Sequence, residues 1–122
     1  MKQKTLAFLE KQPKATRRQE LMASVYNSIG VYYAQMNKPD SAIIFLQKSL
    51  QCPPSIESKP DLYINLSDQY KFKGDLPTAT YYLRLGLAVS DSFDLDKFKF
   101  PIYLGLGDIY LGLRDFKRAD EY

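Results

Sequence analysis

The sequence contains no histidine and no tryptophan, and it has only one cysteine among 122 residues. A single cysteine cannot form a disulfide within the chain, and without histidine the usual zinc ligand sets cannot be assembled. We therefore expect no metal site and no cofactor. Cys52 stands before Pro53 and Pro54, near the expected end of a helix, where a half-buried packing thiol is the simplest interpretation.

Long apolar runs are also missing. Near the N-terminus the only apolar run is Leu6 to Leu9, which is shorter than the hydrophobic region of a signal peptide. No segment of the sequence is long enough to span a membrane. The compartment is left open by the sequence: the cytoplasm is favoured, and the periplasm stays as the alternative if the chain is a fragment excised from a longer protein.

Charge of one sign does not dominate. The 17 basic and 14 acidic residues give a net charge of +3, with only a mild basic cluster between Lys11 and Arg18. Such a balance gives no strongly basic patch of the kind that binds nucleic acid. The sequence also lacks a paired-carboxylate motif and a glycine-rich phosphate loop, so nothing in it indicates a reacting centre. We predict that the chain is not an enzyme.

What the sequence does contain is one spacing that occurs three times. Each unit has two tyrosines seven residues apart, an aliphatic and a small residue between them, and an alanine sixteen residues after the first tyrosine. The members are Tyr26, Ile29, Gly30, Tyr33 and Ala42, then Tyr63, Leu66, Ser67, Tyr70 and Ala79, then Tyr103, Leu106, Gly107, Tyr110 and Ala119.

These spacings predict paired helices. Steps of three, four and seven place each tyrosine set on one stripe of a helix, and the small residue lets a second helix approach closely at its alanine. Asn37 and Gly74 suit the residue that ends a helix, and Asp75 suits the cap of the next one. A third turn is expected at Arg114 to Phe116. All six stripe tyrosines are therefore predicted to lie in the core.

This arrangement resembles the tetratricopeptide repeat family, whose pattern is Trp, Leu, Gly, Tyr, Ala, Phe and Pro in a helix-turn-helix of about 34 residues. The resemblance covers about Ala23 to Tyr122, with tyrosine in place of tryptophan and leucine in place of phenylalanine. The spacing between equivalent tyrosines is longer than in the family, at 37 and 40 residues (63 − 26 and 103 − 63). The extra residues are expected in the connections Cys52–Asp61 and Ser90–Pro101.

The resemblance implies an all-α fold, a right-handed α-solenoid of antiparallel helix hairpins with about three repeats, the last incomplete. The repeats are expected at about residues 23–56, 60–93 and 100–122. Residues 1–22 are expected to hold an N-terminal capping helix or degenerate repeat, which covers the first tyrosine stripe, and the start of a helix near Thr16. Because a repeat cannot bury its stripe alone, we expect the chain to be a fragment of a larger protein, with self-association through the unfinished repeat as one consequence.

The resemblance also implies a concave groove lined by the first helix of each hairpin. The residues facing it lie off the tyrosine stripe, and steps of three and four place each trio on one face. They are Asn27, Val31 and Ala34, then Ile64, Asp68 and Lys71, then Leu104, Asp108 and Leu111. Their mixed apolar and polar character suits a peptide or a helix.

We therefore expect a protein–protein interaction scaffold, as part of a larger regulatory or sensory bacterial protein. One branch of the family grips a C-terminal carboxylate with lysine and asparagine, but Asn27 and Val31 stand in those places here. Asp68 and Asp108 would repel an acidic tail, which favours a basic or neutral ligand. The alternative is a helical-repeat RNA-binding module, which would need a basic groove and a regular base-reading pattern, and neither is found in the sequence.

Overall fold

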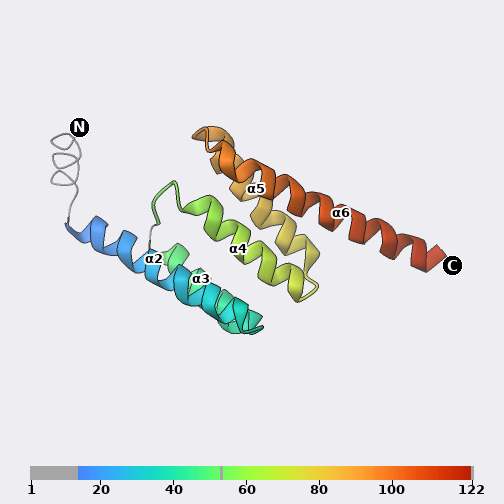
Figure 1. Cartoon of the computed structure of the whole chain (residues 1–122), viewed down its shortest axis with the longest axis horizontal. Helices are drawn as coiled ribbons and strands as arrows, with labels where there is room; N and C mark the ends of the chain where they lie inside the picture. The colour runs from blue at the N-terminus through green and yellow to red at the C-terminus, as the bar shows by residue number, and fades with distance from the viewer. Residues whose placement is uncertain (1–13, 53, 122) are drawn as a thin grey trace.

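The computed structural model describes residues 14–52 and 54–121, with side chains for residues 16–52 and 54–112. The elements are α2 (Lys14–Gln35), α3 (Pro39–Gln51), α4 (Lys59–Phe72), α5 (Leu76–Ser92), the 3₁₀ helix η1 (Asp96–Phe98) and α6 (Lys99–Glu121), shown in Figure 1. The described residues include no strand, which confirms the all-α fold. The capping segment predicted before Lys14 lies outside the described residues.

Two turns divide the first four helices into hairpins, α2 with α3 and α4 with α5. Asn37 and Gly74 have positive φ angles of 58° and 82°, which confirms that they end their helices in the left-handed conformation. Asp75 caps α5 as predicted, because its carboxylate accepts a hydrogen bond from the backbone N–H of Thr78 at 3.2 Å. A proline follows in the first turn of both second helices.

Within each hairpin, the tyrosine pair of the first helix holds one aromatic ring of the second helix between its own rings. All four ring pairs are stacked, in the separation range where aromatic contacts are favourable. The ring centroids are 6.3 and 5.4 Å apart from Phe45 to Tyr26 and Tyr33, and 6.1 and 5.7 Å apart from Tyr82 to Tyr63 and Tyr70. These four tyrosines are half-buried.

The small residue of each stripe contacts the alanine of the paired helix. A Cβ placed on Gly30 would lie 2.7 Å from Cγ of Leu46 and 3.2 Å from the carbonyl oxygen of Ala42. In the second hairpin the hydroxyl of Ser67 donates a hydrogen bond to the carbonyl oxygen of Ala79 at 2.9 Å. The close approach predicted from the repeated spacing is therefore present in both hairpins.

Buried leucine and isoleucine side chains join each hairpin to the next helix. One cluster contains Leu46, Leu62 and Leu66, and the other contains Ala79, Leu83, Ile102 and Ile109. Leu62, Ile102 and Ile109 are outside the predicted stripe, and each precedes a stripe tyrosine by one residue. They lie on the neighbouring helix face, which meets the preceding hairpin.

The third unit differs from the prediction. Helix α6 runs unbroken from Lys99 to Glu121, so the turn expected at Arg114 to Phe116 was wrong. Arg114 occupies the place of Asn37 and Gly74 but has no comparable tolerance for positive φ, and no proline follows it. The local sequence therefore contains nothing that forces the helix to end there.

Because α6 does not fold back, its tyrosine stripe faces solvent. Tyr103 is 56% exposed and Tyr110 is 59% exposed, so the prediction that all six tyrosines lie in the core was wrong for these two. Their neighbours Ile102 and Ile109 are buried in the cluster that joins α6 to α5. None of the described helices combines the length and the apolar character needed to cross a membrane.

Replacing Gly30 by alanine should destabilise the chain, because the new Cβ would overlap the fully buried side chain of Leu46. We expect the free energy of unfolding to fall by about 1–3 kcal/mol, the usual cost of overpacking. Gly112→Ala is the matched control, because no described atom lies within 4 Å of its Cβ position. This control should stabilise the helix by about 0.5–1 kcal/mol. Urea denaturation measures both, and equal effects would contradict close packing at Gly30.

Candidate partner-binding groove

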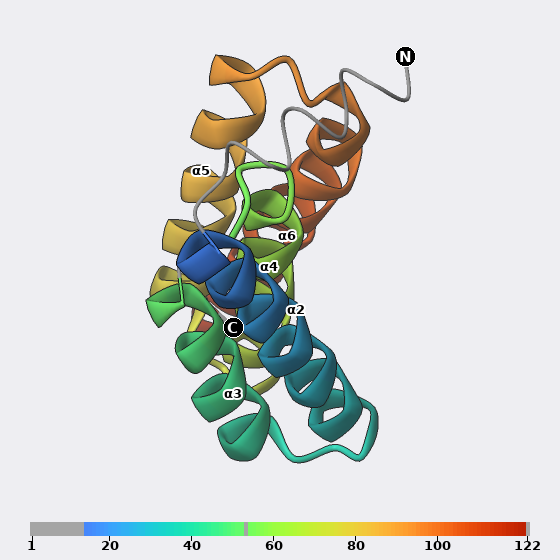
Figure 2. The same ribbon diagram turned by 90° about the vertical axis from the view of Figure 1, so that its left-hand side faces the viewer.

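The first helices of the repeats form one continuous face. Figure 2 shows α2, α4 and α6 on one side of the structure and α3 and α5 on the other. Two polar contacts link neighbouring first helices. The side-chain amide of Asn65 donates to the amide oxygen of Asn27 at 3.2 Å, and the ammonium of Lys71 lies 3.4 Å from a carboxylate oxygen of Asp108.

All nine predicted groove residues belong to these three helices. Four of them are half-buried, namely Asn27, Val31, Ala34 and Ile64. Five are exposed, namely Asp68, Lys71, Leu104, Asp108 and Leu111. The structure brings Lys71 and Asp108 together as an ion pair, which leaves Asp68 as the groove carboxylate outside that pair.

Ala34 and Asp68 line the same pocket, of about 230 Å³, between the C-terminal ends of α2 and α4. Its remaining lining residues are Asn37, Pro39, Gln69 and Phe72. The side chain of Phe72 is 65% exposed. A carboxylate and an accessible aromatic ring therefore meet at one opening, and this combination attracts a cation.

The surroundings of Asp68 also bear on what it can bind. Although the residue as a whole is exposed, partial desolvation of its carboxyl raises the pKa above the ordinary value of 3.8, while the charge of Lys71 acts to lower it. The carboxylate is therefore less well stabilised in the folded chain than it would be in water. A positively charged ligand group at the pocket would compensate for this loss of hydration.

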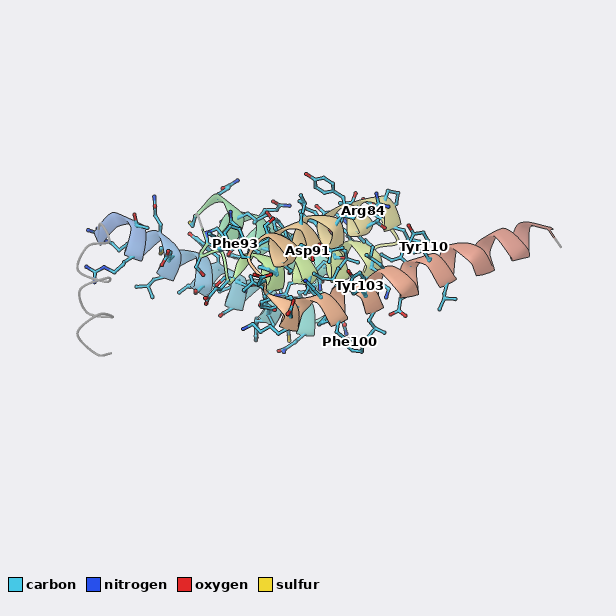
Figure 3. All side chains as sticks on the ribbon, turned by 90° about the horizontal axis from the view of Figure 1, so that it is seen from above. Arg84, Asp91, Phe93, Phe100, Tyr103 and Tyr110 are labelled. Atoms are coloured by element: carbon cyan, nitrogen blue, oxygen red, sulfur yellow. The ribbon has the colours of Figure 1, made fainter. Side chains whose placement is uncertain are left out.

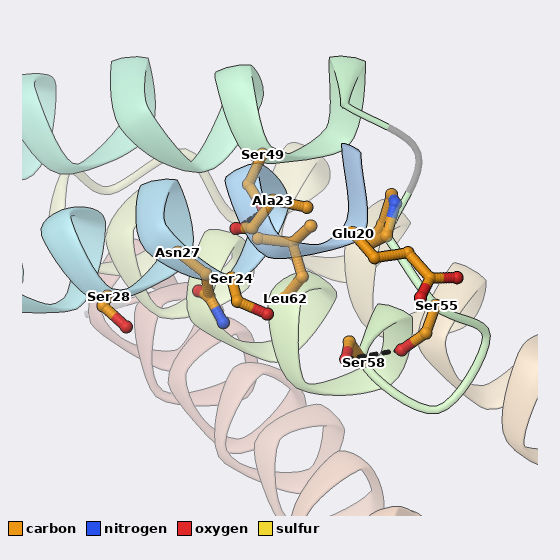
Figure 4. Close-up of a pocket in the computed structure, with 10 residues that line it drawn as sticks. Glu20, Ala23, Ser24, Asn27, Ser28, Ser49, Ser55, Ser58 and Leu62 are labelled. Carbon is orange, nitrogen blue, oxygen red and sulfur yellow. Dashed lines mark hydrogen bonds between the residues drawn. The ribbon is translucent and has the colours of Figure 1, made fainter. Parts of the chain in front are cut away.

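A second pocket, of about 210 Å³, lies toward the N-terminal end of α2 and is shown in Figure 4. Most of its lining side chains are polar. They are Glu20, Ala23, Ser24, Asn27, Ser28, Ser49, Pro54, Ser55, Ser58 and Leu62. The hydroxyl of Ser49 donates to the carbonyl oxygen of Ala23 at 2.6 Å, and the hydroxyls of Ser55 and Ser58 lie 2.8 Å apart.

The two pockets lie along one line of α2. Asn27 lines the first and Ala34 the second, and seven residues of helix correspond to about 10 Å along the axis. Three residues of an extended peptide cover the same length at about 3.3 Å each. Val31 lies between the two pockets on the same face of α2. The predicted groove thus has a polar end, an apolar middle and an acidic and aromatic end.

Glu20, Ser24 and Phe72 line the two pockets but were not among the predicted groove residues. Glu20 and Ser24 precede Asn27 by seven and three residues, and Phe72 follows Asp68 by four. The same helical steps that define the trios therefore reach all three when they are extended along α2 and α4. Within the described residues, no three His, Cys, Asp or Glu side chains gather in a way that could hold a metal ion.

Stacked helix hairpins that contact only their neighbours define a helical-repeat solenoid. The family model of the tetratricopeptide repeat matches residues 23–55 and 100–122. The chain therefore contains tetratricopeptide repeats, one formed by α2 and α3 and one that includes α6. Comparison with curated proteins and with solved structures found no match. Tetratricopeptide repeats generally mediate protein–protein interaction, and proteins of this family are typically non-catalytic scaffolds.

Replacing Asp68 by asparagine should raise the free energy of unfolding at neutral pH, because it removes a partly desolvated carboxylate. A carboxyl whose pKa is raised in the folded chain destabilises the fold above its ordinary pKa, and this effect disappears once the folded and unfolded chains are both protonated. The advantage of Asp68→Asn should therefore shrink as the pH falls toward 3.8. Urea denaturation at several pH values measures it, and an advantage that grows on acidification would contradict this environment.

Proposed function

We propose that the chain is a protein–protein interaction scaffold that binds a peptide or helix with a basic side chain in its groove. The pocket formed by Asp68 and Phe72 is the observation that carries the proposal. A lysine or arginine can place its charged group at the carboxylate of Asp68 while its alkyl stem lies along the ring of Phe72.

The rest of the groove suits the remainder of such a ligand. The hydroxyls of Ser24 and Ser28 and the amide of Asn27 line the polar pocket, where they can bond to the backbone of a peptide. Val31 offers apolar contact between the two pockets, whereas Ile64 packs against the buried cluster that joins α5 and α6. A ligand that places a basic side chain at one end, an apolar one in the middle and polar groups at the other end would match this order.

The charges on this face favour a peptide over the RNA alternative. Glu20 and Asp68 line the two pockets, and Lys71 already pairs with Asp108. A phosphate backbone needs unpaired lysine or arginine side chains along its path, and repulsion from carboxylates would weaken its binding. On the analogy of the family alone, we also propose that the scaffold serves a larger regulatory or sensory protein.

Selection of short displayed peptides on the chain should enrich sequences that contain lysine or arginine. The charge reversal Asp68→Lys should weaken their binding by about tenfold or more, because it replaces an attraction by a repulsion. Asp91→Lys is the control, since it makes the same charge change on α5 outside the groove. It removes the ion pair of Asp91 with Lys99, but Lys99 keeps Asp96 as a partner. Fluorescence anisotropy measures each affinity. Enrichment of acidic peptides, or equal binding to both variants, would contradict the proposal.

Phe72→Ala should weaken the selected peptides by about 3- to 30-fold, the range expected for loss of a cation–π contact. The free energy of unfolding should change by less than about 0.5 kcal/mol, because the ring is largely exposed. Phe93→Ala provides the matched control, because Phe93 is also exposed but follows α5, away from the groove. Isothermal titration calorimetry measures both variants. A loss of affinity with Phe93→Ala as large as with Phe72→Ala would exclude a specific role for the groove ring.

A further inference from the structure

Helix α6 carries an exposed apolar stripe, of which the predicted groove includes only Leu104 and Leu111. Its large side chains are each between 56% and 74% exposed, and they are Phe100, Tyr103, Leu104, Tyr110 and Leu111. Figure 3 shows Phe100, Tyr103 and Tyr110 on α6, whose C-terminal end projects beyond the other helices. Soluble proteins seldom leave so many large apolar side chains together on one helix, and a stripe of this kind marks an interaction surface.

Four residues of the stripe are arranged symmetrically about Gly107. Leu104 and Tyr110 are three residues from it, and Tyr103 and Leu111 are four residues from it. Steps of three and four keep all five residues on one helix face. A face with apolar side chains at equal distances on both sides of its centre is complementary to an antiparallel copy of itself, as a two-fold interface requires.

Within the part of the chain that the structure describes, Gly107 lacks the close helix contact that Gly30, at the same place in the first repeat, makes with α3. A Cβ on Gly30 would overlap Leu46, whereas no described atom lies within 4 Å of the same position on Gly107. Glycine inside a helix destabilises it by up to about 1 kcal/mol relative to alanine. The close approach of another helix, which offsets this cost at Gly30, is therefore absent at Gly107 among the described residues.

From these observations we propose that a second copy of the chain binds to this stripe. The two α6 helices pack antiparallel, with the two Gly107 residues facing each other on the two-fold axis. Tyr103 of each protomer then lies opposite Leu111 of the other, and Leu104 lies opposite Tyr110. The absence of side chains at the centre lets the two backbones approach closely, as they do at Gly30 within the first hairpin.

The area available predicts a weak dimer. An aromatic side chain presents about 200 Å², so the exposed parts of the five side chains amount to roughly 500 Å² per protomer. Two protomers would bury about 1,000 Å² in total, which is the lower limit for a specific interface. Interfaces of this size are typical of transient complexes, so we expect a dissociation constant in the micromolar range or weaker. This association does not depend on the proposed ligand, because the two groove pockets are formed without any residue of α6.

Analytical ultracentrifugation of the full chain from about 1 µM to about 1 mM tests the dimer. The chain should pass from monomer to dimer within this range, and Gly107→Arg should keep it monomeric, because two arginines would meet at the axis. The protomer can accept this arginine, since the space around Gly107 is open. Gly112→Arg makes the same change in an equally open place but off the stripe, and it should leave the dimer intact. A chain that stays monomeric, or a dimer equally sensitive or insensitive to both changes, would overturn the proposal.

Cysteine cross-linking tests the register of the two helices in the Cys52→Ser background. Gly107→Cys should form a disulfide-linked dimer under mild oxidation, because each cysteine would face its own copy. Gly112→Cys should not form one. Residue 112 lies five residues from the two-fold axis in each antiparallel helix, so the two cysteines would be about 15 Å apart along the helix direction. A disulfide needs Cα atoms within about 7 Å. Cross-linking of both variants to the same extent, or of the second alone, would exclude the antiparallel pair centred on Gly107.

Discussion

The contact between a small residue of one helix and an alanine of the next is the constraint on which the hairpins depend. Gly30 and Ser67 bring the second helices so close that Ala42 and Ala79 meet the first helices through their backbone carbonyls. At this distance one aromatic ring of the second helix stacks against two tyrosines of the first. These contacts fix how the first helix is rotated about its axis. They therefore also determine which of its faces is left for a partner.

The sequence predicted most of the local structure because the signals for it are local. Asn37, Gly74 and Asp75 act through their own backbone preferences and side chains, so their roles could be inferred without knowledge of distant contacts. The prediction of a third turn was wrong because the local sequence there contains no such signal. Arg114 provides no such preference, and the spacing of the repeat alone does not end a helix. Whether the tyrosines of α6 are buried depends on a second helix, which that stretch of sequence does not supply.

The sequence could predict which residues share a helix face, but not the pockets that form beside them. The steps of three and four include Asn27, Ala34 and Asp68, which line the two pockets, and their extension reaches Glu20, Ser24 and Phe72. The pockets arise where the ends of α2 and α4 meet the turns beside them, through residues such as Pro39 and Ser58 that belong to no groove pattern. Their existence depends on how two hairpins pack, which involves residues far apart in the chain. The raised pKa of Asp68 depends on the same packing, because desolvation is the main cause of the shift.

The proposed ligand binding and the proposed self-association meet at α6, where Leu104 and Leu111 belong both to the predicted groove and to the symmetric stripe. A ligand confined to the two pockets leaves these leucines free and would be compatible with the dimer. A longer ligand that continues onto α6 would have to displace the second copy, so its binding free energy would be reduced by that of the dimer. By the same linkage it would dissociate the dimer. The length of the ligand therefore decides whether the two interactions are independent or mutually exclusive. The residues that they would share lie on α6, the helix that leaves Tyr103 and Tyr110 exposed.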